Sequence, residues 1–199
     1  MLHNIRAFSN WPSVYLGTGN YVKLRNGLSF RLASRHDIPI IKHVITDRSY
    51  GPFDGGEKII VDIGANVGTF SVLASRECPH ATVYAFEPCA RNFSLLEHNI
   101  KANRSNVIPI KKAVAPERGI ATLYLTGGGD SGHHSLIRSK RNTVSEEKVE
   151  CVTLDDIIDQ VGDIDFLKID IEGMEDAVLN SCTQLHRVKR IEKEKALKS

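Results

Sequence analysis

Acidic residues and glycines stand together at the point where a buried strand should end. In Val61–Phe70, an apolar β-branched run carries Asp62 and then enters a turn that holds Gly64, Asn66 and Gly68. Glycines let the backbone pass close to a ligand, and the helix that follows offers free N–H groups beside it. The turn reads G-A-N-V-G, so Asn66 replaces the second glycine of the dinucleotide fingerprint. The turn therefore favours a ligand without a pyrophosphate.

The segment Val83–Pro88 places a second acid at the end of the next strand. Glu87 follows Gly64 by 23 positions, close to the spacing of about 20 residues at which an acid binds both hydroxyls of a ribose. An acid is common at any helix start, so Glu87 alone is weak evidence. Together with the turn it predicts S-adenosylmethionine, whose methionine part replaces the phosphates. The acidic Asp62 also suits the sulfonium and ammonium charges of that ligand.

A third charged segment, Asp165–Gly173, is expected to end at the same edge of the sheet. Lys168, Asp170 and Glu172 alternate, so in an extended strand their side chains share one face. Such a cluster could accept a proton from a substrate hydroxyl or steer the substrate. An equally weighted alternative is structural: Glu172 caps the next helix, and Lys168 neutralises Asp170.

The elements that carry these segments alternate between strand and helix. Residues 21–32 predict a β-hairpin around Asn26-Gly27, and residues 36–50 predict a helix. Further strands are expected at 58–63, 82–86, 107–110, 121–125, 149–152 and 164–169, and helices at 67–77, 89–103, 154–161 and 175–185. This order predicts an α/β fold with a mainly parallel sheet and helices on both faces. We expect one structural domain, with residues 1–56 as a hairpin-and-helix extension and residues 57–199 as the ligand-binding part.

The segments VDIGANVGTF, VYAFEP, VTLDD and IDFLKIDIEGME resemble, in this order, the FkbM-type methyltransferase family. These are class I S-adenosylmethionine-dependent methyltransferases, and the resemblance runs from about Leu28 to Leu185. It implies a Rossmann-like fold and methyl transfer to an oxygen, commonly a hydroxyl of a sugar or natural product. By position, the implied cofactor-binding residues are Asp62, Gly64, Ala65, Asn66, Val67, Gly68, Glu87 (ribose), Pro88 and Ala113 (adenine). The implied catalytic residues on the substrate side are Lys168, Asp170 and Glu172.

The end of the chain departs from this family pattern. Family members continue with an acidic strand end and two further strands, whereas here Val188–Ile191 could begin a fifth parallel strand before residues 192–199 turn lysine-rich. We therefore expect a fold truncated before its closing strands, with an exposed sheet edge that could form a homodimer. A non-catalytic or truncated methyltransferase-like binding protein remains the alternative function.

The composition of the chain indicates which classes of binding partner to expect. The net charge of +2 does not indicate nucleic acid, and no apolar run approaches a membrane span or the core of a signal peptide. The four cysteines form no C-x-x-C pair, and His133-His134 lacks the further ligands of a metal site. We expect a cytoplasmic protein with a small hydroxylated acceptor and without a metal, nucleic-acid or membrane partner. The glycine-rich loop around His134 is interpreted as a substrate lid, and His43 as a surface or packing residue.

Overall fold

A five-stranded parallel sheet forms the centre of the protein. The computed structural model describes residues 20–46, 48–126, 134–137 and 143–193. The strands follow the order β10-β9-β3-β4-β5, with bounds β3 (Ile59–Ile63), β4 (Thr82–Phe86), β5 (Val107–Ile110), β9 (Phe166–Ile169) and β10 (Ile191–Lys193). The chain runs outward from β3 to β5 on one side and crosses to β9 on the other. The carboxyl ends of β3 and β9 therefore flank the switch point, where open α/β sheets bind ligands.

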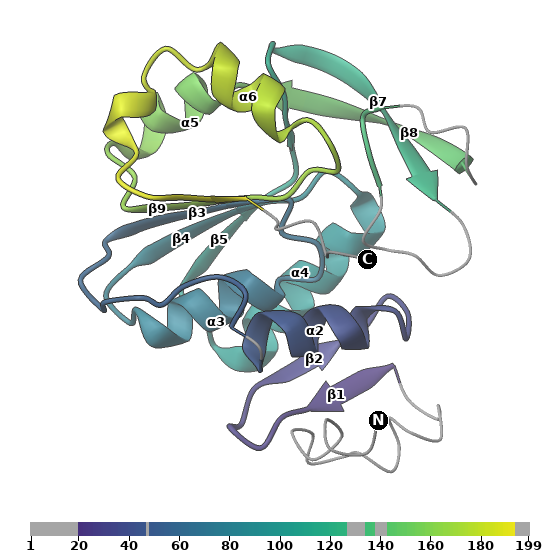
Figure 1. The fold of residues 1–199 in the computed structure, drawn as a ribbon. Coiled ribbons are helices and arrows are strands. Elements are labelled where there is room, and N and C mark those ends of the chain that lie inside the picture. The colour runs from purple at the N-terminus through teal and green to yellow at the C-terminus, as the bar shows by residue number, and fades with distance from the viewer. Residues whose placement is uncertain (1–19, 47, 127–133, 138–142, 194–199) are drawn as a thin grey trace.

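Helices cover both faces of this sheet, as the alternating pattern predicts (Figure 1). The helices α2 (Asp37–Ile45), α3 (Thr69–Glu77) and α4 (Ala90–Asn103) lie on one face, and α5 (Leu154–Val161) and α6 (Glu175–Ser181) lie on the other. Successive strand residues point to opposite faces, so Ile60 joins the core under α3 and Val61 joins the core under α5. Strands that are buried on both faces explain the continuous apolar runs in the sequence.

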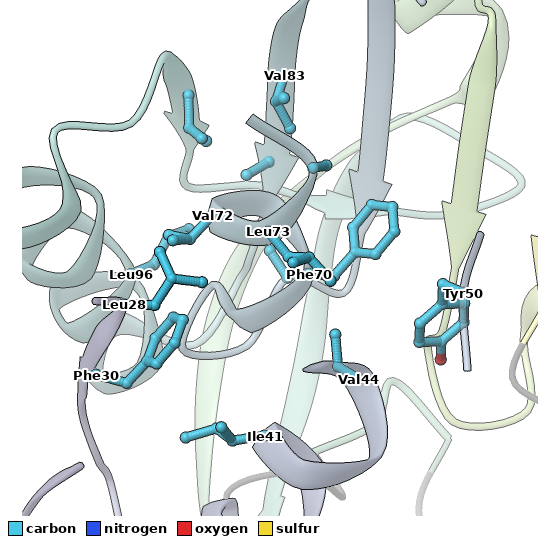
Figure 2. Packing of buried hydrophobic residues seen from close by; sticks show 14 of the residues in the cluster. Leu28, Phe30, Ile41, Val44, Tyr50, Phe70, Val72, Leu73, Val83 and Leu96 are labelled. Carbon is cyan, nitrogen blue, oxygen red and sulfur yellow. The ribbon is translucent and has the colours of Figure 1, made fainter. Parts of the chain in front are cut away.

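The N-terminal hairpin is part of the same core. The strands β1 (Tyr21–Lys23) and β2 (Ser29–Arg31) pair antiparallel, as predicted from Asn26-Gly27. Figure 2 shows Phe30 of β2 and Ile41 of α2 in one apolar cluster with Leu96 of α4. The outer edge of β2 bonds to α4 through amide side chains, because Asn99 binds the backbone of Arg31 at 2.7 and 3.0 Å. The described residues of the predicted N-terminal extension therefore share one apolar core with α3 and α4.

Two helices end earlier than their sequence pattern predicts. The helix α2 stops at Ile45 rather than near residue 50, and Arg48 then adopts a left-handed backbone with φ 48°. The helix α6 stops at Ser181 because the Asp155 carboxylate accepts hydrogen bonds from the N–H groups of Thr183 and Gln184. In contrast, α5 starts as predicted, with a reciprocal capping box between Thr153 and Asp156.

A second, three-stranded sheet was not predicted. It contains β6 (Ala113–Val114), β7 (Gly119–Thr126) and β8 (Thr143–Val152) in the order β6-β8-β7, and Figure 1 shows it beyond the end of the main sheet. The segments 121–125 and 149–152 were predicted as strands without a place in a sheet, and they lie in β7 and β8. The β7–β8 pair is antiparallel, and much of its surface faces solvent. Antiparallel sheets tolerate such exposure, whereas parallel strands are normally covered on both faces.

The strand predicted near Val188 is the edge strand β10, which begins at Ile191 and pairs in parallel with β9. The basic residues before it are paired with acids: Arg187 with Asp163, and Lys189 with Asp165. Residues 194–199 lie outside the described part, so the predicted truncation and homodimer contact stay predictions. Within the described residues, no helix is long and apolar enough to cross a membrane.

Candidate active site

A cavity of about 270 Å³ opens at the carboxyl ends of the central strands. Nine of the residues predicted for the site line it: Gly64, Ala65, Asn66, Glu87, Pro88, Ala113, Lys168, Asp170 and Glu172. They come from the turns after β3 and β4, from β9 and the turn that follows it, and from the start of β6. The topology thus brings together segments that are more than 100 residues apart in the sequence.

Three predicted residues are not among those that line this cavity: Asp62, Val67 and Gly68. Asp62 and Val67 are fully or almost fully buried, with 0% and 1% exposure. Asp62 lies directly opposite Lys168 in the parallel pairing of β3 with β9. Asp62 pairs with Lys168 at 3.0 Å and accepts a hydrogen bond from the Ser71 hydroxyl, and its predicted contact with the cofactor stays a prediction.

The two glycines of the turn are required by protein packing. Both have positive φ, 78° at Gly64 and 86° at Gly68, which side chains rarely adopt. A Cβ at Gly64 would lie 1.9 Å from the carbonyl oxygen of Asp170, and one at Gly68 would lie 2.5 Å from Cδ1 of Leu96. The expected steric reason for glycine holds, but the close neighbour is the protein itself.

Lys168 stands at the centre of a buried charged cluster. Its ammonium group donates a hydrogen bond to the Gly64 carbonyl at 2.8 Å and pairs with Asp62 at 3.0 Å and with Asp170 at 3.6 Å. Burial lowers the pKa of Lys168, but the charges of Asp62 and Asp170 outweigh it and hold the pKa above its usual range. Lys168 therefore stays protonated, so it cannot act as a base. It joins the glycine turn to the end of β9 instead.

Glu87 presents a buried carboxylate at the end of β4. It is 5% exposed and accepts hydrogen bonds from the backbone N–H groups of Asn66 at 2.8 Å and Cys89 at 2.9 Å. Burial raises its pKa to about 7, against these two hydrogen bonds and the charge of Lys168. Each oxygen keeps a further lone pair, so the carboxylate can accept from two ligand hydroxyls.

Asp170 and Glu172 both reach the cavity, although not by strand alternation as predicted. The strand β9 ends at Ile169, and Glu172 has a left-handed backbone with φ 55°. The N-cap of α6 is Met174, which makes no side-chain cap hydrogen bond, and Glu175 instead accepts from the N–H group of Ile171 in the preceding turn at 2.8 Å. The alternative pairing of Lys168 with Asp170 is present, but Asp62 is the closer partner.

The sequence did not identify several residues that line the cavity. They include Pro39, Ile40, His43, Val44 and Tyr50 from the N-terminal extension and Thr69 and Phe70 of α3. Ser135 and Leu136, from the loop that was interpreted as a substrate lid, also line the cavity. His43, which was predicted to be a surface or packing residue, is half-buried and lines the cavity. Ser135 of this loop donates a hydrogen bond to the Glu172 carbonyl at 3.2 Å, and the role of the loop as a substrate lid stays a prediction. His133 lies outside the described residues.

The cavity has polar atoms that fit a nucleoside ligand with hydrogen-bonding groups. Asn66 Oδ1 and Thr69 Oγ1 are buried, and neither has a hydrogen-bond partner within the described residues. Both residues line the cavity. Buried polar atoms normally have partners, so these two suit a bound molecule. Near Ala113, the apolar side chains of Val114 and Leu123 add a surface for a flat ring.

The strand order, the glycine turn after the first central strand and the acid after the second define a Rossmann-like class I methyltransferase, whose cofactor is S-adenosylmethionine. The chain belongs to the FkbM methyltransferase family, because the family model described as "Methyltransferase FkbM domain" matches residues 62–195. This match includes Glu87, Lys168, Asp170 and Glu172. It does not include His43 and Tyr50.

Several curated relatives are similar over most of the chain. The methyltransferase sdnD of Sordaria araneosa is 28% identical, with 74% of this chain and 69% of the relative covered. The 31-O-demethyl-FK506 methyltransferase FkbM of Streptomyces tacrolimicus is 28% identical, with 70% and 66% covered. Among solved structures, precorrin-6y C5,15-methyltransferase of Geobacter metallireducens GS-15 is 17% identical, with 71% of this chain and 56% of that chain covered and a TM-score of 0.45.

Proposed function

We propose that this chain transfers the methyl group of S-adenosylmethionine to a hydroxyl of a small acceptor, such as a sugar or another natural product. The observation that carries this proposal is the placement of Glu87 and Asp170 on one cavity, at the ends of β4 and β9. One carboxylate suits the ribose of the cofactor, and the other suits the acceptor. A relative whose printed name describes methylation of an oxygen supports the choice of a hydroxyl.

The cofactor half comprises the turn after β3 and the residues after β4. Glu87 would accept hydrogen bonds from the ribose hydroxyls, while Asn66 Oδ1 and Thr69 Oγ1 would bind polar groups of the same ligand. Ala113 belongs to the apolar end of the cavity and would contact the adenine. When bound, S-adenosylmethionine supplies a methyl group on a cationic sulfur, which keeps the bonding electron pair as the methyl leaves.

The acceptor half lies around Asp170 and Glu172. A hydroxyl is a poor nucleophile until it loses its proton. As the acceptor oxygen forms its new bond to carbon, its O–H bond must break, and the Asp170 carboxylate would accept the proton. The side chain of Asp170 is 26% exposed, so an acceptor in the cavity can reach it. Because Lys168 stays protonated, it holds Asp170 rather than taking the proton.

The acceptor test is methyl transfer from labelled S-adenosylmethionine to a library of hydroxylated sugars and natural products. We expect a product methylated on oxygen, and Asp170→Asn should lower kcat at least about 100-fold, the usual contribution of a positioned base. Asp163→Asn is the matched control, because Asp163 is exposed and pairs with Arg187. Cofactor binding without turnover on any acceptor would favour the non-catalytic alternative.

A further inference from the structure

Tyr50 contributes to the cavity from outside the segment that the family model matches. It follows α2, lines the cavity and is 6% exposed. Its ring contacts Phe70 of α3 edge to face, with the ring centroids 5.5 Å apart (Figure 2). Phe70 in turn packs against Phe166 of β9, at 5.7 Å between centroids. The Tyr50 ring is thus fixed against the core, which determines where its hydroxyl points.

The Tyr50 hydroxyl reaches the candidate base. It donates a hydrogen bond to Asp170 Oδ2 at 3.4 Å. The ammonium of Lys168 approaches the same oxygen at 3.6 Å and lies 5.7 Å from the centroid of the Tyr50 ring. Two donors from different elements therefore face Oδ2 of Asp170. The other oxygen, Oδ1, is the one left to receive a proton from an acceptor.

Lys168 alone does not fix this carboxylate. The ammonium group of Lys168 lies closer to the Gly64 carbonyl, at 2.8 Å, and to Asp62, at 3.0 Å. Its interaction with Asp170 is therefore the weakest of the three. Asp170 also lies beyond the end of β9 at Ile169, where the sheet no longer holds the backbone on both sides. A second donor, on a ring held by the core, restricts the rotation of the carboxylate.

We propose that Tyr50 is a positioning residue for Asp170, so that the N-terminal extension completes the active site. This inference rests on the proposed function. The hydroxyl of Tyr50 acts through Asp170, because it holds Oδ2 and so orients Oδ1 toward the acceptor. Its loss should lower kcat while leaving cofactor binding intact, because Glu87 and Asn66 belong to the other half of the cavity.

Tyr50→Phe is the decisive variant, because it keeps the ring contact with Phe70 and removes only the hydroxyl. Tyr84→Phe is the matched control, since Tyr84 lies on β4 and does not line the cavity. Tyr50→Phe should lower kcat about tenfold or more, with the acceptor KM and the S-adenosylmethionine Kd within about twofold of wild type. Tyr84→Phe should leave all three unchanged.

A second measurement detects the contact between Tyr50 and Asp170 without any enzymatic turnover. With aspartate carboxyl carbons labelled for NMR, the Asp170 signal should move in Tyr50→Phe and stay in place in Tyr84→Phe. An unmoved Asp170 signal, or an active Tyr50→Phe with wild-type kcat, would overturn the inference while leaving the proposed function intact. If wild-type protein binds the cofactor but methylates no hydroxyl, the proposed function fails, and this role of Tyr50 fails with it.

Discussion

The carbonyl oxygen of Asp170 occupies the space that a side chain at Gly64 would need. A Cβ on Gly64 would lie 1.9 Å from that oxygen, so the turn after β3 and the end of β9 touch through their backbones. The ammonium of Lys168 bonds the Gly64 carbonyl at 2.8 Å across the same junction. This contact joins the part of the cavity wall that we assign to the cofactor to the part that we assign to the acceptor.

Gly64→Ala should be strongly destabilising for this reason. It combines a left-handed backbone with a clash against a backbone atom, and we expect a loss of about 3 kcal/mol or more in the free energy of unfolding. Gly162→Ala is the control, because Gly162 has φ 87° but no heavy atom within 4 Å of its Cβ position. It should cost only about 1 kcal/mol. Equal losses in denaturant unfolding would show that the clash is relieved elsewhere.

Removal of Lys168 should leave a buried charge without its partner. Lys168→Met leaves the fully buried carboxylate of Asp62 without its positive partner. We therefore expect a loss of about 3 kcal/mol in the free energy of unfolding. Adding Asp62→Asn should recover part of this loss, because the unpaired charge is then removed. A double-mutant cycle measures that coupling, and strictly additive losses would contradict the pairing. Lys193→Met, in an exposed pair with Asp176, should change stability by less than about 1 kcal/mol.

Asn99 should tie the N-terminal hairpin to the remainder of the fold. Its side chain is buried and bonds the Arg31 backbone and, at 2.8 Å, the Val67 carbonyl. Asn99→Ala leaves these groups unsatisfied and should cost about 3 kcal/mol. In Asn99→Ala, the rate of hydrogen exchange should increase more at the Arg31 amide than at the amides of β3. The exposed His98→Ala is the control, and normal protection of Arg31 in Asn99→Ala would argue against this anchoring role.

Cofactor affinity should depend on pH through Glu87. Its pKa of about 7 in the folded protein means that acid protonates the carboxylate and removes an acceptor for the ribose. Lys168 favours the charged form of Glu87, and Asp62 disfavours it. Affinity should therefore rise from pH 5 to pH 7 by about tenfold per unit and level off above. Glu87→Gln should flatten this profile, whereas a slope that persists in Glu87→Gln would assign it to another group.

The main sheet and much of the cavity could be predicted because their signals are local. Val61 and Ile63 belong to a buried β-branched run, and Glu87 follows at a recognisable spacing. The second sheet could not be predicted from the sequence. Its strands pair with each other and not with the strands of the main sheet, and no local pattern shows this. The places of His43 and Tyr50 on the cavity depend on how α2 packs against α3, and no motif marks either residue. The pairing of Asp62 with Lys168 could not be predicted, because it depends on the register of β3 against β9.

The central claim is that Glu87 belongs to a working S-adenosylmethionine site. Calorimetric titration of the wild-type chain with S-adenosylmethionine tests it most directly, beside Glu87→Ala and the control Glu97→Ala on the exposed side of α4. We expect micromolar binding by wild type and Glu97→Ala, and a loss of about tenfold or more in Glu87→Ala. No binding by folded wild-type protein, or equal affinity in Glu87→Ala, would contradict the assignment.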